Sequence, residues 1–230
     1  MSLMNIPMPR EQLERIVRQV VRQQFADRLA AGQAQLSAAY EPNLVVNTSA
    51  RHMHITAEDL QTLFGPGAEL TVYRWLYQPG EFASEQRVSI MGPRKRMIDN
   101  VRILGPVRAE SQIEISFTDA IALGIDSPVR PSGKTDGTPG CLVVGPAGSI
   151  ELPRGVIRAE RHVHMTPADA AVYGFTNGQY VKLRVESDCS TTFEQTLCRV
   201  DPKFLLEVHL DTDESNTCDL AGAKSVALLL

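Results

Sequence analysis

The chain has 230 residues, of which 43% are hydrophobic and 22% charged, and its formal net charge is −4. This length is enough to bury a core in one large domain or two small ones. The charge balance gives no sign of the clustered basic face of a nucleic-acid-binding protein, and no apolar run approaches the roughly 18 residues that a membrane helix needs. We therefore expect that neither nucleic acid nor a membrane is a partner.

The four cysteines, Cys141, Cys189, Cys198 and Cys218, are scattered without a Cys-x-x-Cys spacing. A chain of this length needs no disulfide framework, so a reducing cytosolic environment is expected. Cys141, Cys189 and Cys198 lie in strand-like runs and are expected to be small core residues.

The first elements in chain order are an amphipathic helix within residues 1–28 and a linker at 29–42. Apolar residues recur at three- and four-residue steps between positions 8 and 28, with Arg and Gln on the other face. The stretch at 29–42 is rich in Ala, Gly, Gln and Ser, which is typical of a linker. Two interpretations are open: the helix packs on the body of the domain, or it is tethered and gains stability by docking on a partner.

From Leu44 onward short extended segments dominate the chain. Turn residues such as Pro79-Gly80 and Gly145-Pro146 separate them, and many short strands at close spacing favour a mainly β barrel or sandwich. Short helices are expected to begin at Thr56, Thr118 and Thr166. The predicted strands are 43–49, 69–76, 86–91, 101–104, 112–116, 141–144 and 180–185.

A histidine motif occurs twice, as Arg51-His52-Met53-His54 and as Arg161-His162-Val163-His164. The residues that follow also match, with a Thr and an Asp in register after each pair. The chain has only five histidines, so this repetition is informative. An internal duplication of a strand–turn–helix unit is the simplest explanation, and two barrel-like halves follow as a hypothesis.

The spacing within each pair indicates metal binding. Residues i and i+2 of a strand project from the same face, so two imidazoles lie side by side. Such a pair packs poorly in a core, whereas neutral imidazole is a good ligand for Zn²⁺ and related ions. Four imidazoles could complete the coordination of one ion or be shared between two.

The residue four positions after the first pair, Glu58, fits a known metal-ligand spacing but is not expected to be a ligand. The corresponding acidic residue of the second copy, Asp169, lies one position further on. Helix capping explains the pattern better, with Thr56 and Thr166 at the N-cap and an aspartate three residues later.

Three further residues are candidates with weaker support from the pattern. His209 lies in an alternating, strand-like stretch, and Glu114 shares a strand face with Gln112 and Ser116, where a carboxylate is usually solvated. Arg108 follows a Gly-Pro turn, where a guanidinium could hold an anion. No serine-hydrolase elbow, dinucleotide-binding motif or P-loop is present.

With these residues assembled, the chain from about Leu44 to Ala227 closely resembles the phosphate propanoyltransferase family, phosphotransacylases associated with bacterial microcompartments. The resemblance rests on the following segments: Ser49-Ala50-Arg51-His52-Met53-His54, Leu104-Gly105-Pro106-Val107-Arg108, Gln112-Ile113-Glu114, Arg130-Pro131-Ser132-Gly133, Arg161-His162-Val163-His164-Met165 and His209-Leu210-Asp211-Thr212-Asp213-Glu214-Ser215-Asn216.

The resemblance implies a fold of two β-barrel domains capped by short helices. The first strand would complete the barrel formed mainly by the carboxy-terminal part. Barrel domain 1 is then expected at 43–50 and 160–230, and barrel domain 2 at 51–159.

The resemblance also implies a two-zinc site between the barrels. His52 and His54 would hold one ion, with substrate or solvent completing its coordination, and Glu114, His162, His164 and His209 would hold the other. Arg108 would bind phosphate, and Ser132 would lie close to the site. The expected coenzyme A contacts are Ser49, Arg74, Arg102, Leu104, His209 and Asn216. The chain departs from the family at Ala50, often Asn, and at Lys134, often acidic, so contacts beside the site are expected to differ.

The implied reaction is acyl-CoA plus phosphate going reversibly to acyl phosphate plus coenzyme A, by direct attack of phosphate on the thioester. The resemblance favours docking for the N-terminal helix, which would direct a homo-oligomeric enzyme into the lumen of a bacterial microcompartment through shell or core proteins. Two alternatives are a zinc-dependent hydrolase that activates water and a non-catalytic, metal-stabilised adaptor.

Overall fold

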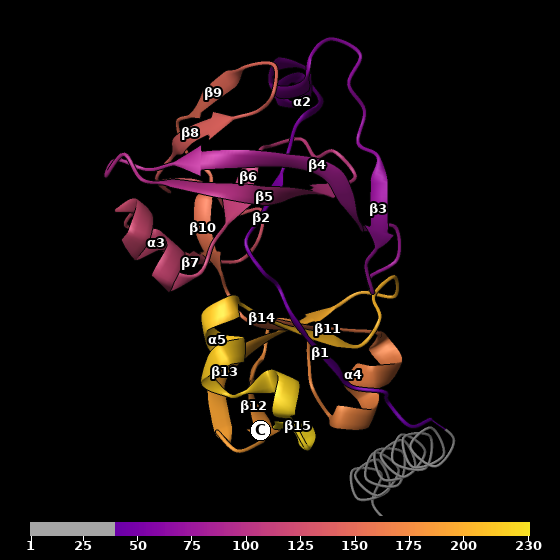
Figure 1. The fold of residues 1–230 in the computed structure, drawn as a ribbon. Coiled ribbons are helices and arrows are strands. Elements are labelled where there is room, and N and C mark those ends of the chain that lie inside the picture. The colour runs from indigo at the N-terminus through magenta and orange to yellow at the C-terminus, as the bar shows by residue number, and fades with distance from the viewer. Residues whose placement is uncertain (1–39) are drawn as a thin grey trace, which may run out of the picture. The chain divides into compact units, whose positions relative to one another are not determined.

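The computed structural model describes residues 40–230. The predicted helix at 1–28 lies outside the described residues, as does the linker up to residue 39. Residues 43–230 form one unit, built from two curled β-sheets that each enclose their own apolar core (Figure 1). No helix in the described part is long and apolar enough to cross a membrane.

The larger sheet has nine strands and contains the first histidine pair. Its strand order is β7-β10-β6-β2-β5-β4-β8-β9, and β3 pairs with β4 beside this path. The strands are β2 (His52–His54), β3 (Val72–Trp75), β4 (Phe82–Met91), β5 (Met97–Gly105), β6 (Gln112–Glu114), β7 (Val129–Arg130), β8 (Cys141–Val144), β9 (Ser149–Leu152) and β10 (Val156–Ala159). Helices α2 (Ala57–Phe64) and α3 (Phe117–Leu123) accompany this sheet.

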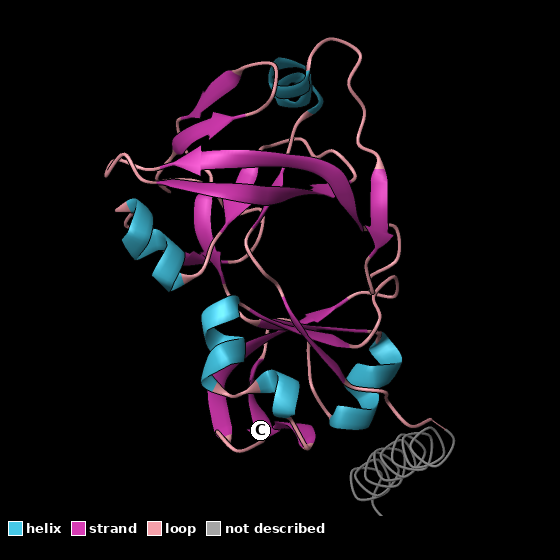
Figure 2. Cartoon of the chain, in the orientation of Figure 1, coloured by secondary structure: helices cyan, strands magenta, loops and turns pink. Residues whose placement is uncertain are grey.

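The smaller sheet has six strands and contains the second pair. Its order is β1-β14-β11-β13-β12-β15, so the first described strand joins the last part of the chain. The strands are β1 (Val45–Thr48), β11 (His162–Met165), β12 (Tyr180–Glu186), β13 (Thr191–Val200), β14 (Glu207–Leu210) and β15 (Ser225–Leu229). Three short helices accompany this sheet (Figure 2): α4 (Pro167–Tyr173), α5 (Thr212–Thr217) and the 3₁₀ helix η1 (Leu220–Gly222).

Both sheets surround their histidine strand in the same way. Strand β2 lies between β5, which is parallel to it, and β6, which is antiparallel. Strand β11 lies between parallel β13 and antiparallel β14. The central residue of each motif, Met53 or Val163, is fully buried in the core of its own sheet. The two histidines on either side of it therefore face away from that core, as the strand alternation predicts.

The arginine that opens each motif also makes equivalent contacts. Arg51 Nε lies 2.9 Å from Asp119, the carboxylate of the capping box of α3. Arg161 Nε lies 2.7 Å from Glu214, which occupies the same position in α5. Each arginine thus ties its histidine strand to the helix that follows the antiparallel neighbour.

Two helix starts were predicted correctly from their caps. The Thr56 hydroxyl accepts a hydrogen bond from the Asp59 amide at 3.0 Å, and the Thr166 hydroxyl accepts one from the Asp169 amide at 3.1 Å. Glu58 is exposed on α2, as expected for a helix residue that is not a ligand.

The helix predicted to start at Thr118 begins one residue earlier, at Phe117. Its N-cap is Ser116, whose hydroxyl accepts from the Asp119 amide while the Asp119 carboxylate accepts from the Ser116 amide. Ser116 had been placed at the end of a strand, which hid its capping role.

Every predicted strand range contains a strand, and the mainly β prediction is confirmed. Strands β7, β9, β10, β13 and β15 were not among the predicted ranges. The ladder order of each sheet has two ends, so the sheets are best described as curled half-barrels. The proposed domain boundaries remain a prediction.

Candidate metal and anion site

The first histidine pair is held in a fixed orientation by the backbone. His52 Nδ1 lies 2.8 Å from the Ala50 carbonyl oxygen. A carbonyl can only accept, so this nitrogen carries the proton and Nε2 keeps its lone pair. Nε2 of His52 lies 3.2 Å from Nε2 of His54, with the two rings nearly perpendicular at 84°.

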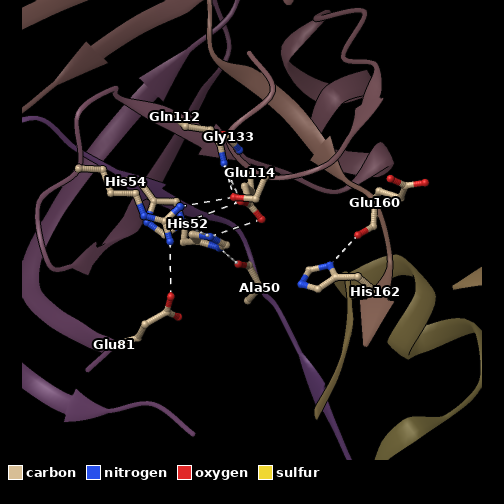
Figure 3. Close-up of polar contacts among 11 residues, drawn as sticks. Ala50, His52, His54, Glu81, Gln112, Glu114, Gly133, Glu160 and His162 are labelled. Carbon is tan, nitrogen blue, oxygen red and sulfur yellow. Dashed lines mark hydrogen bonds and ion pairs between the residues drawn. The ribbon is translucent and has the colours of Figure 1, made fainter. Parts of the chain in front are cut away.

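Glu114 joins this pair through the register of the sheet, because His52 on β2 is directly opposite Glu114 on β6. Its carboxylate oxygens lie 3.5 Å from His52 Nε2 and 3.8 Å from His54 Nε2 (Figure 3). Gln112 donates from Nε2 to Glu114 at 2.7 Å. The three candidate ligands thus form one buried cluster, which we call the first group: His52, His54 and Glu114.

The second group consists of His162, His164 and His209. His162 is opposite His209 in the β11–β14 ladder, and their rings stack with centroids 4.8 Å apart. His162 Nδ1 lies 2.7 Å from the Glu160 carbonyl oxygen, the same backbone contact that orients His52. His164 stacks on Phe204 at 4.0 Å.

Three of these histidines are held neutral by their surroundings. Burial, followed by repulsion from a neighbouring histidine, lowers the pKa of His54 to about 3, of His162 to about 4 and of His164 to about 2. Burial alone would raise the pKa of Glu114, but His52 and His54 together lower it to about 2. At neutral pH these three side chains are therefore neutral imidazoles and Glu114 is a carboxylate, the protonation states that ligate metals.

Unpaired buried nitrogens indicate that these groups fit a metal. His164 is 7% exposed, and neither of its ring nitrogens has a hydrogen-bond partner; Nδ1 of buried His54 also lacks one. Leaving such polar atoms unpaired costs about 1–3 kcal/mol each. Imidazole nitrogens with one carboxylate are a typical donor set for Zn²⁺.

The structure places Glu114 with the first group, whereas the sequence expectation assigned it to the same ion as the second group. Its carboxylate lies beside the first pair, although His162 also contributes to its lowered pKa. Glu114, His162 and His209 line a small cavity together. The carboxylate is thus close to both groups.

A cleft of about 1160 Å³ brings both groups and the anion-binding candidate together. Its wall includes all six candidate metal ligands, Arg108 and Ser132. Ser49, Arg74, Arg102, Leu104 and His209, five of the six expected coenzyme A contacts, also line it. The sixth, Asn216, is exposed on α5 and is not part of the wall.

The Arg108 side chain is positioned by two neighbours from other segments. It donates to the Ser132 hydroxyl at 3.4 Å and lies 3.6 Å from the Glu81 carboxylate. Gln112 also donates to Ser132, at 2.9 Å, and accepts from the Gly133 amide at 2.7 Å. Gln112 therefore connects the turn at Ser132 to Glu114, so the anion-binding candidate and the first group share one hydrogen-bond network.

Sequence reasoning missed several residues of this cleft. Glu81, Arg199, Phe204 and Glu207 all line it. A signal existed for Glu207, because it precedes His209 by two residues in a strand and so shares its face. Its carboxylate lies 3.1 Å from His209 Nε2. The other three have no local signature, since strands and loops distant in sequence bring them to the cleft.

The family model for phosphate propanoyltransferase matches residues 45–221. The chain belongs to the phosphate propanoyltransferase family. It is 52% identical over 222 residues to the phosphate propanoyltransferase of Planctopirus limnophila, which covers 96% of this chain and 91% of that protein. The Thermotoga maritima protein of the same name is 51% identical over 181 residues, 78% of this chain and 86% of its own length.

A third relative, from Rhodopseudomonas palustris, is 41% identical over 210 residues, 91% of this chain and 92% of its own length. Membership of the phosphate propanoyltransferase family, which the sequence motifs predicted, is confirmed. The chain is accordingly an enzyme, a phosphate acyltransferase. The relatives give no support to the hydrolase alternative.

Proposed function

We propose that the enzyme transfers a short acyl group reversibly between coenzyme A and inorganic phosphate, as the name of its relatives suggests. The observation that carries this proposal is the single cleft that holds both metal-binding groups and Arg108. A phosphate held by the guanidinium lies in the same space as an acyl thioester.

The proposed site holds two zinc ions. His52 and His54 hold one, with substrate or solvent completing the coordination, and Glu114, His162, His164 and His209 hold the other. In this assignment the Glu114 carboxylate turns from the first pair toward His162, with which it already lines a small cavity. When bound, zinc supplies Lewis acidity toward a carbonyl and affinity for a thiolate.

Side chains of the protein position the phosphate beside the thioester. Arg108 holds the phosphate through charge-assisted hydrogen bonds, and Ser132 and Glu81 hold the guanidinium. Fixing the nucleophile beside the thioester makes the reaction effectively intramolecular. A phosphate oxygen attacks the thioester carbonyl carbon, the C–S bond breaks, and coenzyme A leaves with the electron pair on sulfur.

Direct attack requires no acyl-enzyme. None of the four cysteines, all of which lie in the described part, lines the cleft. Ser132 lines it, but its hydroxyl accepts hydrogen bonds from Arg108 and Gln112, the arrangement of a positioning group. Ping-pong kinetics or a trapped acyl-enzyme would contradict direct attack.

The decisive experiment is metal analysis combined with an assay of coenzyme A release from acetyl-, propionyl- and butyryl-CoA. We expect release to require phosphate, to yield acyl phosphate and to disappear on zinc removal. Release that is independent of phosphate would instead identify a zinc-dependent hydrolase. No release, from a protein whose metal ions are fully ligated by side chains, would favour the non-catalytic adaptor.

The matching strand order around β2 and β11 supports a second part of the proposal, that the two halves arose by internal duplication. His52 opposite Glu114 corresponds to His162 opposite His209. The barrel domains at 43–50 with 160–230 and at 51–159 would be the duplicated units, with β1 added to the unit at 160–230.

The remaining part of the proposal concerns location. The amphipathic pattern within residues 1–28 supports an encapsulation helix that binds microcompartment shell or core proteins, and a homo-oligomeric enzyme in the lumen. Deleting residues 1–35 should leave acyl transfer intact while abolishing co-purification with shells. A truncated enzyme that loses activity or fails to fold would show instead that the helix belongs to the domain.

A further inference from the structure

One aromatic ring of the cleft wall lies against a candidate metal ligand. Phe204 is half-buried and lines the cleft, and it is not part of the apolar core of the smaller sheet. Its ring stacks on the His164 ring, with centroids 4.0 Å apart and an angle of 14° between the planes. A phenyl ring has neither donor nor acceptor, so this contact satisfies neither ring nitrogen of His164. Phe204 therefore brings an apolar surface to the second histidine group.

The backbone around Phe204 is anchored on both sides. Its amide donates to the Asp201 carbonyl at 3.1 Å, within the turn between β13 and β14. The next residue, Leu205, donates from its amide to the Gln78 side chain at 3.1 Å, and its carbonyl accepts from the same side chain at 3.0 Å. The Arg199 guanidinium lies 5.8 Å from the centroid of the Phe204 ring. A ring fixed in this way is a preformed wall for a ligand.

Arg199 connects the Phe204 ring with the anion-binding candidate. Burial lowers the pKa of Arg199, the charge of Arg108 lowers it further, and Glu114 raises it. Arg199, Arg108 and Glu114 all line the cleft, so these charges are close to one another within it. The ring is thus beside the space where the proposed reaction brings phosphate and the thioester carbonyl together.

The other large apolar side chains of the cleft wall come from the larger sheet. They belong to β3, to its connection with β4, or to β5: Tyr73, Trp75, Leu76, Tyr77 and Leu104. Among the described residues, Phe204 is the one large apolar side chain that the segments of the smaller sheet contribute to the cleft. It also is the one of these six whose ring stacks on a candidate ligand.

We propose that Phe204 forms a wall of the acyl pocket and limits the length of the acyl chain that the enzyme accepts. This inference rests on the proposed function, because it requires an acyl thioester in the cleft. A short aliphatic chain is stabilised by an apolar surface, and a phenyl ring supplies one without a polar atom to desolvate. A fixed wall also sets an upper limit, since additional methylenes would have to displace the ring.

The kinetic arm of the test compares hexanoyl-CoA with propionyl-CoA as substrates. Phe204→Ala removes the ring, so the ratio of kcat/KM for hexanoyl-CoA to that for propionyl-CoA should rise about tenfold, the lower end of the effect of one methylene in an apolar pocket. Phe204→Leu should raise the ratio less, and the larger ring of Phe204→Trp should lower it. Both rates come from one preparation, so a partial loss of zinc or of folded enzyme lowers them alike.

The ratio also separates a pocket wall from a purely structural role. If the ring only supports His164, its removal should lower the zinc content and the activity with both substrates equally. A ratio that stays at the native value in all three variants would therefore overturn the inference.

Phe117→Ala is the matched control. Its ring is 53% exposed and has the Arg158 guanidinium over it at 4.6 Å, but it does not line the cleft. This variant should keep the native ratio of kcat/KM for the two substrates.

The binding arm uses two unreactive thioethers, S-propyl-CoA and S-hexyl-CoA, and isothermal titration calorimetry. Phe204→Ala should raise the affinity for S-hexyl-CoA about tenfold relative to that for S-propyl-CoA. An equal change for both thioethers would contradict a limit on chain length. If the native enzyme transfers no acyl group to phosphate, the proposed function fails, while the two thioether affinities still decide whether Phe204 limits the chain.

Discussion

We expect the Arg108 side chain to determine how the reaction rate depends on phosphate concentration. Its guanidinium has Ser132 and Glu81 as partners and faces the cleft. Arg108→Ala removes charge-assisted hydrogen bonds worth about 1.5–3 kcal/mol, so the KM for phosphate should rise roughly 10- to 100-fold. Steady-state kinetics with phosphate as the varied substrate measure this, and the KM for acyl-CoA serves as the internal control.

Arg108→Lys tests the geometry rather than the charge. A lysine keeps the positive charge but lacks the planar fork that binds two phosphate oxygens at once. We expect phosphate binding between that of the native enzyme and that of the alanine variant. A native KM for phosphate in both variants would remove Arg108 from the phosphate site.

The cysteines make a second residue-scale prediction. Burial raises the pKa of the Cys141 thiol to about 12 and that of Cys198 to about 11, and Cys218 is also buried with a raised pKa. Only the thiolate attacks a disulfide reagent, so near pH 8 these three groups should react slowly. The expectation that Cys189 is a core residue was wrong, because it lies in the turn between β12 and β13 and is exposed. An Ellman-type assay should count one fast thiol per native chain and four after denaturation. Fast reaction of more than one thiol in the native protein would contradict the described burial.

The histidine and glutamate cluster also shows how far single residues could be predicted. The repeated pair and its strand alternation predicted that His52 and His54 share a face. The local sequence pattern predicted only that Glu114 lies on the polar face of a strand. Its place beside His52 depends on the pairing of β2 with β6, whose residues are about 60 positions apart in sequence. A non-local register of this kind has no signature in either strand alone.

At the scale of the element, the capping box of α4 yields a stability prediction. The Thr166 hydroxyl accepts from the Asp169 amide, and the Asp169 carboxylate accepts from the Thr166 amide at 2.8 Å. Thr166→Ala leaves this helix end without its side-chain acceptor and should lower the free energy of unfolding by about 1 kcal/mol. Thr166→Ser keeps the hydroxyl and should be nearly neutral. Urea unfolding of both variants measures the difference, and equal stability would show that the cap contributes little.

The elements that the sequence predicted well are those whose structure is determined by residues adjacent in sequence. Threonine caps predicted the starts of α2 and α4, apolar alternation predicted strands such as β12, and a short apolar run between glycines predicted β8. Strand β13 was not predicted because its alternation is interrupted at Gln195, which has a φ of 56°. Strands β7, β9 and β10 are equally short or shorter, but they mix polar and apolar residues instead of forming a continuous apolar run as β8 does, so their own sequences are not distinctive. Their pairing partners, rather than their own sequences, make them strands.

At the scale of the whole molecule, Gln78 links the two sheets next to the cleft. It lies in the loop between β3 and β4 of the larger sheet. Its side chain donates to the Leu205 carbonyl at 3.0 Å and to Glu207 at 2.7 Å, and it accepts from the Leu205 amide at 3.1 Å. Glu207 lies on β14 of the smaller sheet, so one buried amide connects the walls that hold the first and second histidine groups.

Gln78→Ala should therefore weaken the junction as a whole. The Glu207 carboxylate is buried and would keep Asn47, at 2.6 Å, and His209, at 3.1 Å, while losing the Gln78 donor. A hydrogen bond to a charged group contributes about 1.5–3 kcal/mol, so the free energy of unfolding should fall by that amount. Gln78→Glu should be worse, because it sets a second carboxylate against Glu207 in a buried site. Chemical denaturation of both variants beside the native enzyme checks the order native, alanine, glutamate; a glutamate variant as stable as the native enzyme would show that the amide does not hold the two sheets together.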